Sequence, residues 1–166
     1  MTVSIFRVYP LLMPSRAEHI TVAKIVQMGR TCAGFNLRKT TRVVTQLYEE
    51  ALRPLGMRST QFMLLAAIKG QEPVTVQRLA TTVMMDRTTV TRDLKPLEKQ
   101  GLVRVEPGED RRERRVSLTM QGDKALVAAL PRLEALEARI IKTVGKERVA
   151  RLLADLAAAT ALIRPS

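Results

Sequence analysis

The chain has 166 residues, enough for one compact domain with flanking segments and too few for a multidomain enzyme. Hydrophobic residues make up 46% of it and charged residues 27%, which excludes wholesale disorder. Lys and Arg number 28 against 16 Asp and Glu, and a net charge of +12 favours a polyanionic partner, nucleic acid before an anionic membrane surface.

Cysteine and histidine each occur once, as Cys32 and His19. One of each excludes an intrachain disulfide, a cysteine zinc cluster and most histidine chemistry, so we expect no metal and no cofactor. Arg7 and Pro10 interrupt the apolar start of the chain, and no later apolar run approaches the ~20 residues that cross a bilayer. We therefore expect a cytoplasmic protein without a membrane partner.

The first part of the chain divides into an extension and a helix. Residues 1–34 contain two prolines and scattered polar residues, and we expect an N-terminal extension with a short helix around residues 17–28. From Asn36 to Leu55 apolar residues recur at intervals of three and four, which is the single stripe of an amphipathic helix. Gly56 ends it.

Three short helices are predicted next. Ser59 or Thr60 is expected to cap the first, which stops at Gly70, and Thr75 is expected to cap the second. Asp86 caps the third, because its carboxylate can accept hydrogen bonds from the first turn. The apolar stripe of this third helix consists of Val90, Leu94 and Leu97.

After Gly101 the hydrophobic period changes from 3.6 to 2. Residues 102–106 and 115–118 are therefore predicted to form a β-hairpin, joined by a charged tip. Thr119 is expected to cap a long helix that ends at Gly145, and a last helix covers residues 146–163. Short helices followed at once by a hairpin are typical of a winged helix-turn-helix domain.

The helix after Asp86 has a face suited to DNA. With its apolar stripe turned inward at ~100° per residue, the opposite face carries hydroxyl and cationic side chains and no carboxylate. These residues are Thr88, Thr91, Arg92, Lys95 and Lys99. Arg92 can pair with guanine O6 and N7, while Arg87 at the helix start suits a phosphate. The alternative is an ordinary solvated face.

The tip of the hairpin is too charged for a simple turn. Residues 109–114 include three arginines, which a narrow minor groove would attract through its negative potential. A solubilising loop is the alternative.

The run DRTTVTRDLKPLEKQGLVRVEPGEDRRERRVSLT, residues 86–119, resembles the MarR family of transcriptional regulators. In that family a recognition helix ending L-x-x-L-E-x-x-G-L-V leads into a wing with a D-x-R pair, matched here by Asp110 and Arg112. The helix end is matched by Leu94, Leu97, Glu98, Gly101, Leu102 and Val103. The resemblance extends over residues 35–163.

The resemblance implies a mainly α-helical fold with a small β-hairpin wing, and a homodimer on double-stranded DNA. Residues 57–119 would form the winged helix-turn-helix domain, between a first dimerisation helix at 35–56 and C-terminal dimerisation helices at 120–166. Arg112 would enter the minor groove, oriented by an ion pair with Asp110. The expected recognition-helix contacts are Arg87, Thr88, Thr89, Thr91, Arg92 and Lys95, and those of the wing are Asp110, Arg111, Arg112 and Arg114.

The function that follows is a regulator, more specifically a repressor of a palindromic operator, and not an enzyme. Family members respond to small lipophilic or aromatic ligands, and candidates for such a pocket are Tyr48, Phe62 and Met63, although core packing explains them equally well. Cys32 near a helix start could instead sense oxidants, and an idle thiol is the alternative there. A nonspecific architectural DNA-binding protein is the other class that remains open.

Overall fold

The computed structural model describes residues 21–108, 110 and 113–163, and the chain divides into two compact units, residues 1–41 and 42–166. In the first unit, α1 (Val22–Thr31) is capped by Thr21, whose hydroxyl accepts from the Lys24 backbone N–H. The predicted helix is thus confirmed in part: it begins at Val22 and ends at Thr31, and residues 17–20 lie outside the described part of the chain.

The amphipathic helix α2 (Ala33–Leu52) starts three residues before the predicted Asn36. A 3-10 turn, η1 (Arg53–Leu55), follows it, and Gly56 stops the turn in the left-handed conformation at φ 63°. The predicted end at Gly56 is confirmed, with the last turn tightened.

The cap predicted for the next helix, α3 (Ser59–Lys69), is wrong. Arg58 occupies the cap position, and the Gln61 side chain accepts from its backbone N–H at 2.9 Å. Ser59 lies inside the helix, where its backbone N–H and its hydroxyl both donate to the Glu49 carboxylate of α2, at 2.8 and 2.6 Å. These two hydrogen bonds lower the pKa of Glu49. A group ten residues away in sequence therefore satisfies the helix start.

The two helices of the helix-turn-helix follow the predicted pattern. Thr75 caps α4 (Val76–Thr82) by accepting from the Arg78 N–H at 3.1 Å, and Asp86 caps α5 (Arg87–Lys99). Helix α5 continues through Pro96.

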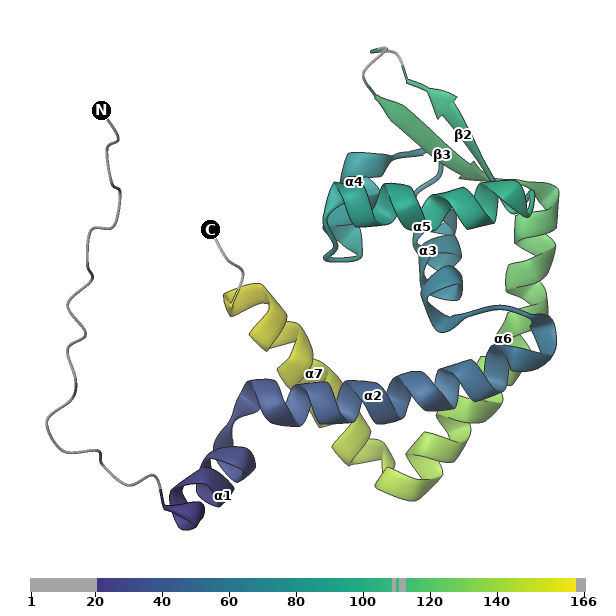
Figure 1. Ribbon diagram of the computed structural model, residues 1–166. Coiled ribbons are helices and arrows are strands. Elements are labelled where there is room, and N and C mark those ends of the chain that lie inside the picture. Colours follow the sequence, from purple (N-terminus) through teal and green to yellow (C-terminus); the bar gives the residue numbers. More distant parts are fainter. Residues whose placement is uncertain (1–20, 109, 111–112, 164–166) are drawn as a thin grey trace, which may run out of the picture. The chain divides into compact units, whose positions relative to one another are not determined.

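The sheet has three strands where the sequence predicted two. Strands β2 (Val103–Pro107) and β3 (Arg114–Leu118) form the expected hairpin, and β1 (Val74–Thr75) pairs antiparallel with the other edge of β3. The strand order is β1-β3-β2. In Figure 1 the hairpin rises beside α4 and α5, which places the wing next to the recognition helix.

A single apolar core binds these elements together. Its fully buried members, the largest of which are Leu52, Leu64, Leu65, Ile68, Leu79 and Leu97, come from α2, α3, α4 and α5. Strand β3 adds Val116, and helix α6 (Met120–Val144) adds Ala129 and Leu133. The helix-turn-helix, wing and long helix thus share one core, which fixes the outward face of α5.

The long helix α6 starts close against the wing. Thr119 caps it, accepting from the Gly122 N–H at 3.1 Å. A side chain at buried Gly122 would meet the Leu102 carbonyl oxygen at 2.1 Å, so only glycine permits this approach. Gly145, at φ 97°, separates α6 from α7 (Lys146–Leu162).

Candidate nucleic-acid interface

The start of α5 is held by Asp86. Its carboxylate accepts from the Thr89 backbone N–H at 2.8 Å and from the Thr89 hydroxyl at 2.6 Å. These hydrogen bonds lower the Asp86 pKa, so the cap is ionised near neutral pH. The carboxylate also interacts favourably with the positive end of the helix dipole.

The two faces of α5 are arranged as predicted. Val90, Leu94 and Leu97 are buried, with at most 3% of each side chain exposed. Exposed residues make up the opposite side, which consists of the predicted Thr88, Thr91, Arg92, Lys95 and Lys99. Together with the exposed Arg87 at the helix start, we call them the basic face. Thr89, also a predicted DNA contact, is half-buried, and its hydroxyl hydrogen is given to Asp86.

Within the basic face, Arg92 has a defined orientation. Its Nε–H donates to the Asp93 carboxylate at 3.3 Å. The contact uses Nε and not the two terminal amino groups, which are the donors that pair with guanine O6 and N7. Asp93 itself is only partly exposed, so its charge lies at the flank of the basic face.

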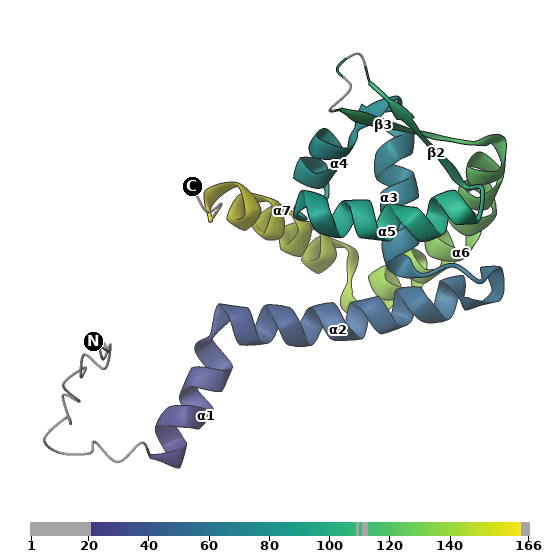
Figure 2. The ribbon, with the colours of Figure 1, turned by 45° about the horizontal axis from the view of Figure 1, so that its top comes forward.

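A groove of about 310 Å³ lies between α5 and the wing. Figure 2 shows the strands β2 and β3 beside α5. It is lined by Val76, Arg87, Thr91, Leu94, Lys95, Glu98, Val105 and Arg114. Three of these residues are cations and one, Glu98, is an acid, so the groove has a positive balance. Arg114 at the start of β3 therefore faces the same depression as Arg87 and Lys95 of the recognition helix.

The predicted contacts at the wing tip are described only in part. Asp110 is exposed, while Arg111 and Arg112 lie outside the described residues, as does the expected ion pair of Arg112 with Asp110. Arg104 of β2 contacts Glu106 at 3.6 Å, on the strand farther from β1. Among the described wing residues, Val105 and Arg114 line the groove with α5, and Arg114 is the charged one of the two.

The candidate ligand residues have different surroundings in the fold. The Tyr48 hydroxyl on α2 donates to the Glu137 carboxylate on α6, and burial together with this carboxylate raises the pKa of Tyr48 to about 12. Phe62 is half-buried against the core, and Met63 is 39% exposed.

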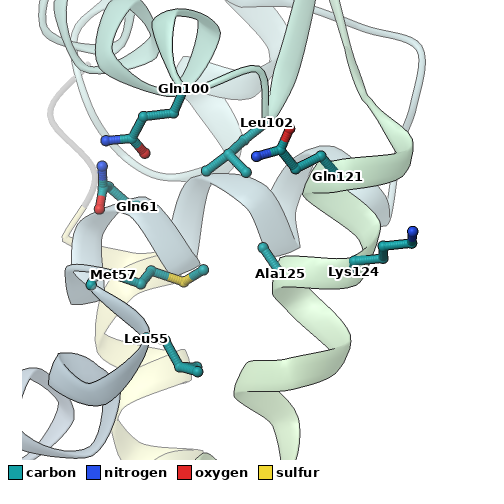
Figure 3. Close-up of a pocket in the computed structure, with 9 residues that line it drawn as sticks. Leu55, Met57, Gln61, Gln100, Leu102, Gln121, Lys124 and Ala125 are labelled. Atoms are coloured by element: carbon teal, nitrogen blue, oxygen red, sulfur yellow. The ribbon is translucent and has the colours of Figure 1, made fainter.

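A separate cavity of about 570 Å³ lies where α3 begins, α5 ends and α6 begins (Figure 3). Its apolar lining includes Leu55, Met57 and Leu102, and its polar lining includes Gln61, Gln100, Gln121 and Lys124. Tyr48, Phe62 and Met63 do not line it. The hydrophobic period predicted Leu55 as part of the apolar stripe of the first amphipathic helix. It did not indicate that the glutamines line a cavity.

Cys32 lies between α1 and α2. Its thiol is exposed, and its sulfur accepts from the Phe35 backbone N–H at 3.4 Å, in the first turn of α2. In the described residues no group of three or more His, Cys, Asp or Glu side chains could hold a metal ion. Nor does any helix of those residues combine the length and apolar character that crossing a bilayer requires.

This geometry is that of a winged helix-turn-helix protein, and comparison with known proteins agrees. Residues 57–113 match the model of the MarR family. An HTH-type transcriptional regulator of Bacillus cereus is 32% identical over 121 residues, which cover 72% of this chain and 80% of that protein. YwoH, a Bacillus subtilis HTH-type transcriptional regulator, is 32% identical over 88 residues, and this chain spans 64% of its length.

The similarity to transcriptional regulators of solved structure covers more of the chain. The M. tuberculosis transcriptional regulator MosR, in complex with DNA, is 38% identical with a TM-score of 0.70, covering 81% of this chain and 99% of that one. A mutant of MarR from E. coli, complexed with operator DNA, is 25% identical with a TM-score of 0.72, covering 82% and 95% of the two chains. The chain belongs to the MarR family of transcriptional regulators.

Proposed function

We propose that two copies of this chain bind one palindromic operator in double-stranded DNA and repress transcription until a small lipophilic or aromatic ligand releases them. The observation that carries the proposal is the basic face of α5. Its cations and hydroxyls project outward from a helix that Val90, Leu94 and Leu97 anchor. A carboxylate in that position would be repelled by the phosphates that line a major groove.

The relatives support a DNA partner. MosR and a mutant of E. coli MarR, to both of which this chain is similar, were solved with DNA. In this chain the groove between α5 and the wing holds Arg87, Lys95 and Arg114, so helix and wing offer cations to one duplex. Arg112 and Asp110 belong to the proposal as predicted minor-groove contacts of the wing.

The exposed apolar surface of α7 supports a homodimer. No residue of α7 is buried in the single chain. Its exposed apolar residues include Leu152, Leu153, Leu156 and Leu162, with exposed fractions between 37% and 85%. A patch of this kind marks an interface in a folded chain, and a second copy would also match the two-fold symmetry of a palindrome.

The ligand is the least specified part of the proposal. Tyr48, Phe62 and Met63 remain candidates for contacts with it, and the cavity of Figure 3 offers an apolar floor with amide and ammonium groups at its rim. A ligand in that cavity would touch the end of α5 and the start of β2 through Gln100 and Leu102. It would thus act where the recognition helix joins the wing.

Selection of bound sequences from a random duplex pool tests the function. We expect an inverted repeat whose half-site centres are about one helical turn apart. The repeat should bind ~10³-fold or more tightly than its scrambled form at the same salt concentration. Enrichment of no motif, with equal affinity for all duplexes, would indicate an architectural DNA-binding protein instead.

The Cys32 geometry favours a second means of release. The Cys32 thiol is exposed, so peroxide can reach it, and its sulfur accepts an N–H in the first turn of α2. If oxidation releases DNA, mild peroxide should weaken operator binding of the wild type and leave Cys32→Ser unaffected. Equal behaviour of the two proteins would reject Cys32 as a sensor.

A further inference from the structure

The link between α3 and β1 contains the carboxylate of Glu72, which is not part of the basic face. Glu72 Oε2 accepts from the Leu118 backbone N–H of β3 at 2.9 Å, and Glu72 Oε1 lies 3.0 Å from the Lys69 ammonium. The same ammonium lies 2.7 Å from the Asp123 carboxylate in the first turn of α6. Only 25% of the Glu72 side chain is exposed. One short polar chain therefore joins the end of α3, the end of β3 and the start of α6.

The strand register explains why a side chain reaches Leu118. In the antiparallel pair of β1 and β3, Val74 stands opposite Val116, and the same register continued back along the chain would bring Glu72 opposite Leu118. Strand β1 is only two residues long and begins after Glu72. The Glu72 carboxylate supplies the acceptor that a longer β1 would have supplied through its backbone.

The base of the wing, where β2 begins and β3 ends, is held on two sides. On the β2 side, the Thr119 backbone N–H donates to the Leu102 carbonyl at 3.1 Å, and Gly122 packs against the same carbonyl. On the opposite edge of β3, the short β1 ladder and Glu72 hold the strand. The same strand begins with Arg114, which lines the groove with α5. The direction of β3 therefore decides where Arg114 meets the recognition helix.

We propose that Glu72 is a positioning residue for DNA binding: it fixes β3, and with it the wing, at the angle at which Arg114 and α5 engage one duplex. The inference rests on the proposed function, since it concerns the same surface. A hydrogen bond to a charged acceptor that is mostly shielded from water is among the stronger polar contacts, which suits this task.

The direction in which Glu72→Ala changes the affinity for DNA distinguishes a positioning role from a purely electrostatic one. Glu72→Ala removes a negative charge from a protein that binds a polyanion, so electrostatics alone predicts tighter binding. Positioning predicts the opposite, since Leu118 loses its acceptor. Glu72→Gln removes the charge but keeps an oxygen that can accept from Leu118, so it should restore binding.

The experiment measures affinity for the selected operator and amide hydrogen exchange at Leu118 in the same proteins. For Glu72→Ala we expect roughly fivefold to tenfold weaker binding and faster exchange at Leu118, given the usual effect of losing one such hydrogen bond. Glu72→Gln should stay within about twofold of the wild type in affinity and keep slow exchange. Glu106→Ala, which removes an exposed wing carboxylate, is the matched charge control and should bind as tightly as the wild type or more tightly.

Equal or tighter binding by Glu72→Ala would overturn the proposal, whether or not exchange at Leu118 changes. If Glu72→Ala does not fold, Glu72→Met, which fills a similar volume without an acceptor, takes its place with the same expectations. If the wild type shows no sequence preference, the proposed function fails. In that case, faster exchange at Leu118 in Glu72→Ala than in the wild type would still show that Glu72 holds β3 through this hydrogen bond. Unchanged exchange in Glu72→Ala would reject that role as well.

Discussion

Arg92 is the residue of the basic face whose chemistry is most specific. Its Nε–H is engaged by Asp93, and its terminal amino groups remain the donors suited to guanine. Arg87 differs, because it lies at the helix start and lines the groove toward the wing. The first is thus suited to read a base and the second to contact a phosphate.

Arg92→Ala should reduce operator affinity by ~1 to 3 kcal/mol and relax the preference at one base pair of each half-site. Arg87→Ala is the matched control, since it should weaken binding to all sequences alike and reduce the salt dependence. Titrations of both variants against the operator and its single-base changes give the answer. Equal losses for Arg92→Ala on operator and random duplex would reassign Arg92 to a phosphate.

The contribution of Tyr48 to the stability of the folded chain depends on pH. Its hydroxyl donates to Glu137, and the Tyr48 pKa is raised from 10.0 to about 12 in the folded chain. A group whose pKa is raised by folding stabilises the folded state below its unfolded pKa, and this contribution is lost as the pH rises toward the folded value. The window is therefore pH 10 to 12.

We expect Tyr48→Phe to lower the free energy of unfolding by about 1 kcal/mol at pH 8, because the Glu137 carboxylate loses its donor. The difference between wild type and variant should shrink between pH 10 and 12. Urea unfolding at several pH values measures it, and the variant corrects for lysines that titrate in the same range. A difference that does not change across the window would show that the hydroxyl does not act through its proton.

At the scale of elements, helices whose determinants lie within one turn were predictable. The Asp86 cap and the stripe of Val90, Leu94 and Leu97 are local in sequence, so period and capping rules located α5 and both of its faces. Cap residues with remote partners were not predictable, because Ser59 is satisfied by Glu49 of another helix.

Strand β1 shows the same limit. Two residues carry no period, and β1 exists because Val74 and Thr75 pair with β3, which lies 40 residues further along the chain. The hydrogen bond from Leu118 to Glu72 has the same origin. The recognition helix of the candidate site was therefore predictable from sequence. The groove beside α5, the cavity of Figure 3 and the contact of Glu72 with β3 could be found only in the folded structure.

The wing as an element contributes through Arg114. Arg114→Ala should weaken operator binding and make the salt dependence shallower by about one phosphate contact, a slope change of ~0.9. Arg104→Ala is the control, since it removes the same charge from the other strand of the hairpin, outside the groove. Affinities over a range of salt concentrations measure both slopes, and equal slopes for Arg114→Ala and the wild type would remove β3 from the interface.

At the scale of the whole molecule, the account requires two chains on one operator. Leu153 of α7 is 61% exposed in the single chain, and a charge there would be desolvated in a dimer interface. Leu153→Glu should therefore yield folded monomers that bind the inverted repeat far more weakly. Met84→Glu, at an exposed position between α4 and α5 and outside the predicted dimerisation helices, should stay dimeric. Sedimentation of the wild type and the two variants measures their oligomeric states. A dimeric Leu153→Glu would place the interface elsewhere.

Tethered cleavage shows whether the basic face of α5 lies against the bases of the operator. Because Cys32 is the single cysteine, a Cys32→Ser background allows a DNA-cleaving iron chelate to be attached at Lys95→Cys alone. Cuts are expected inside each half-site of the selected repeat, symmetric about its centre, and none from the same reagent at Val127→Cys. Cuts that are absent, or spread evenly along the duplex, would contradict that arrangement.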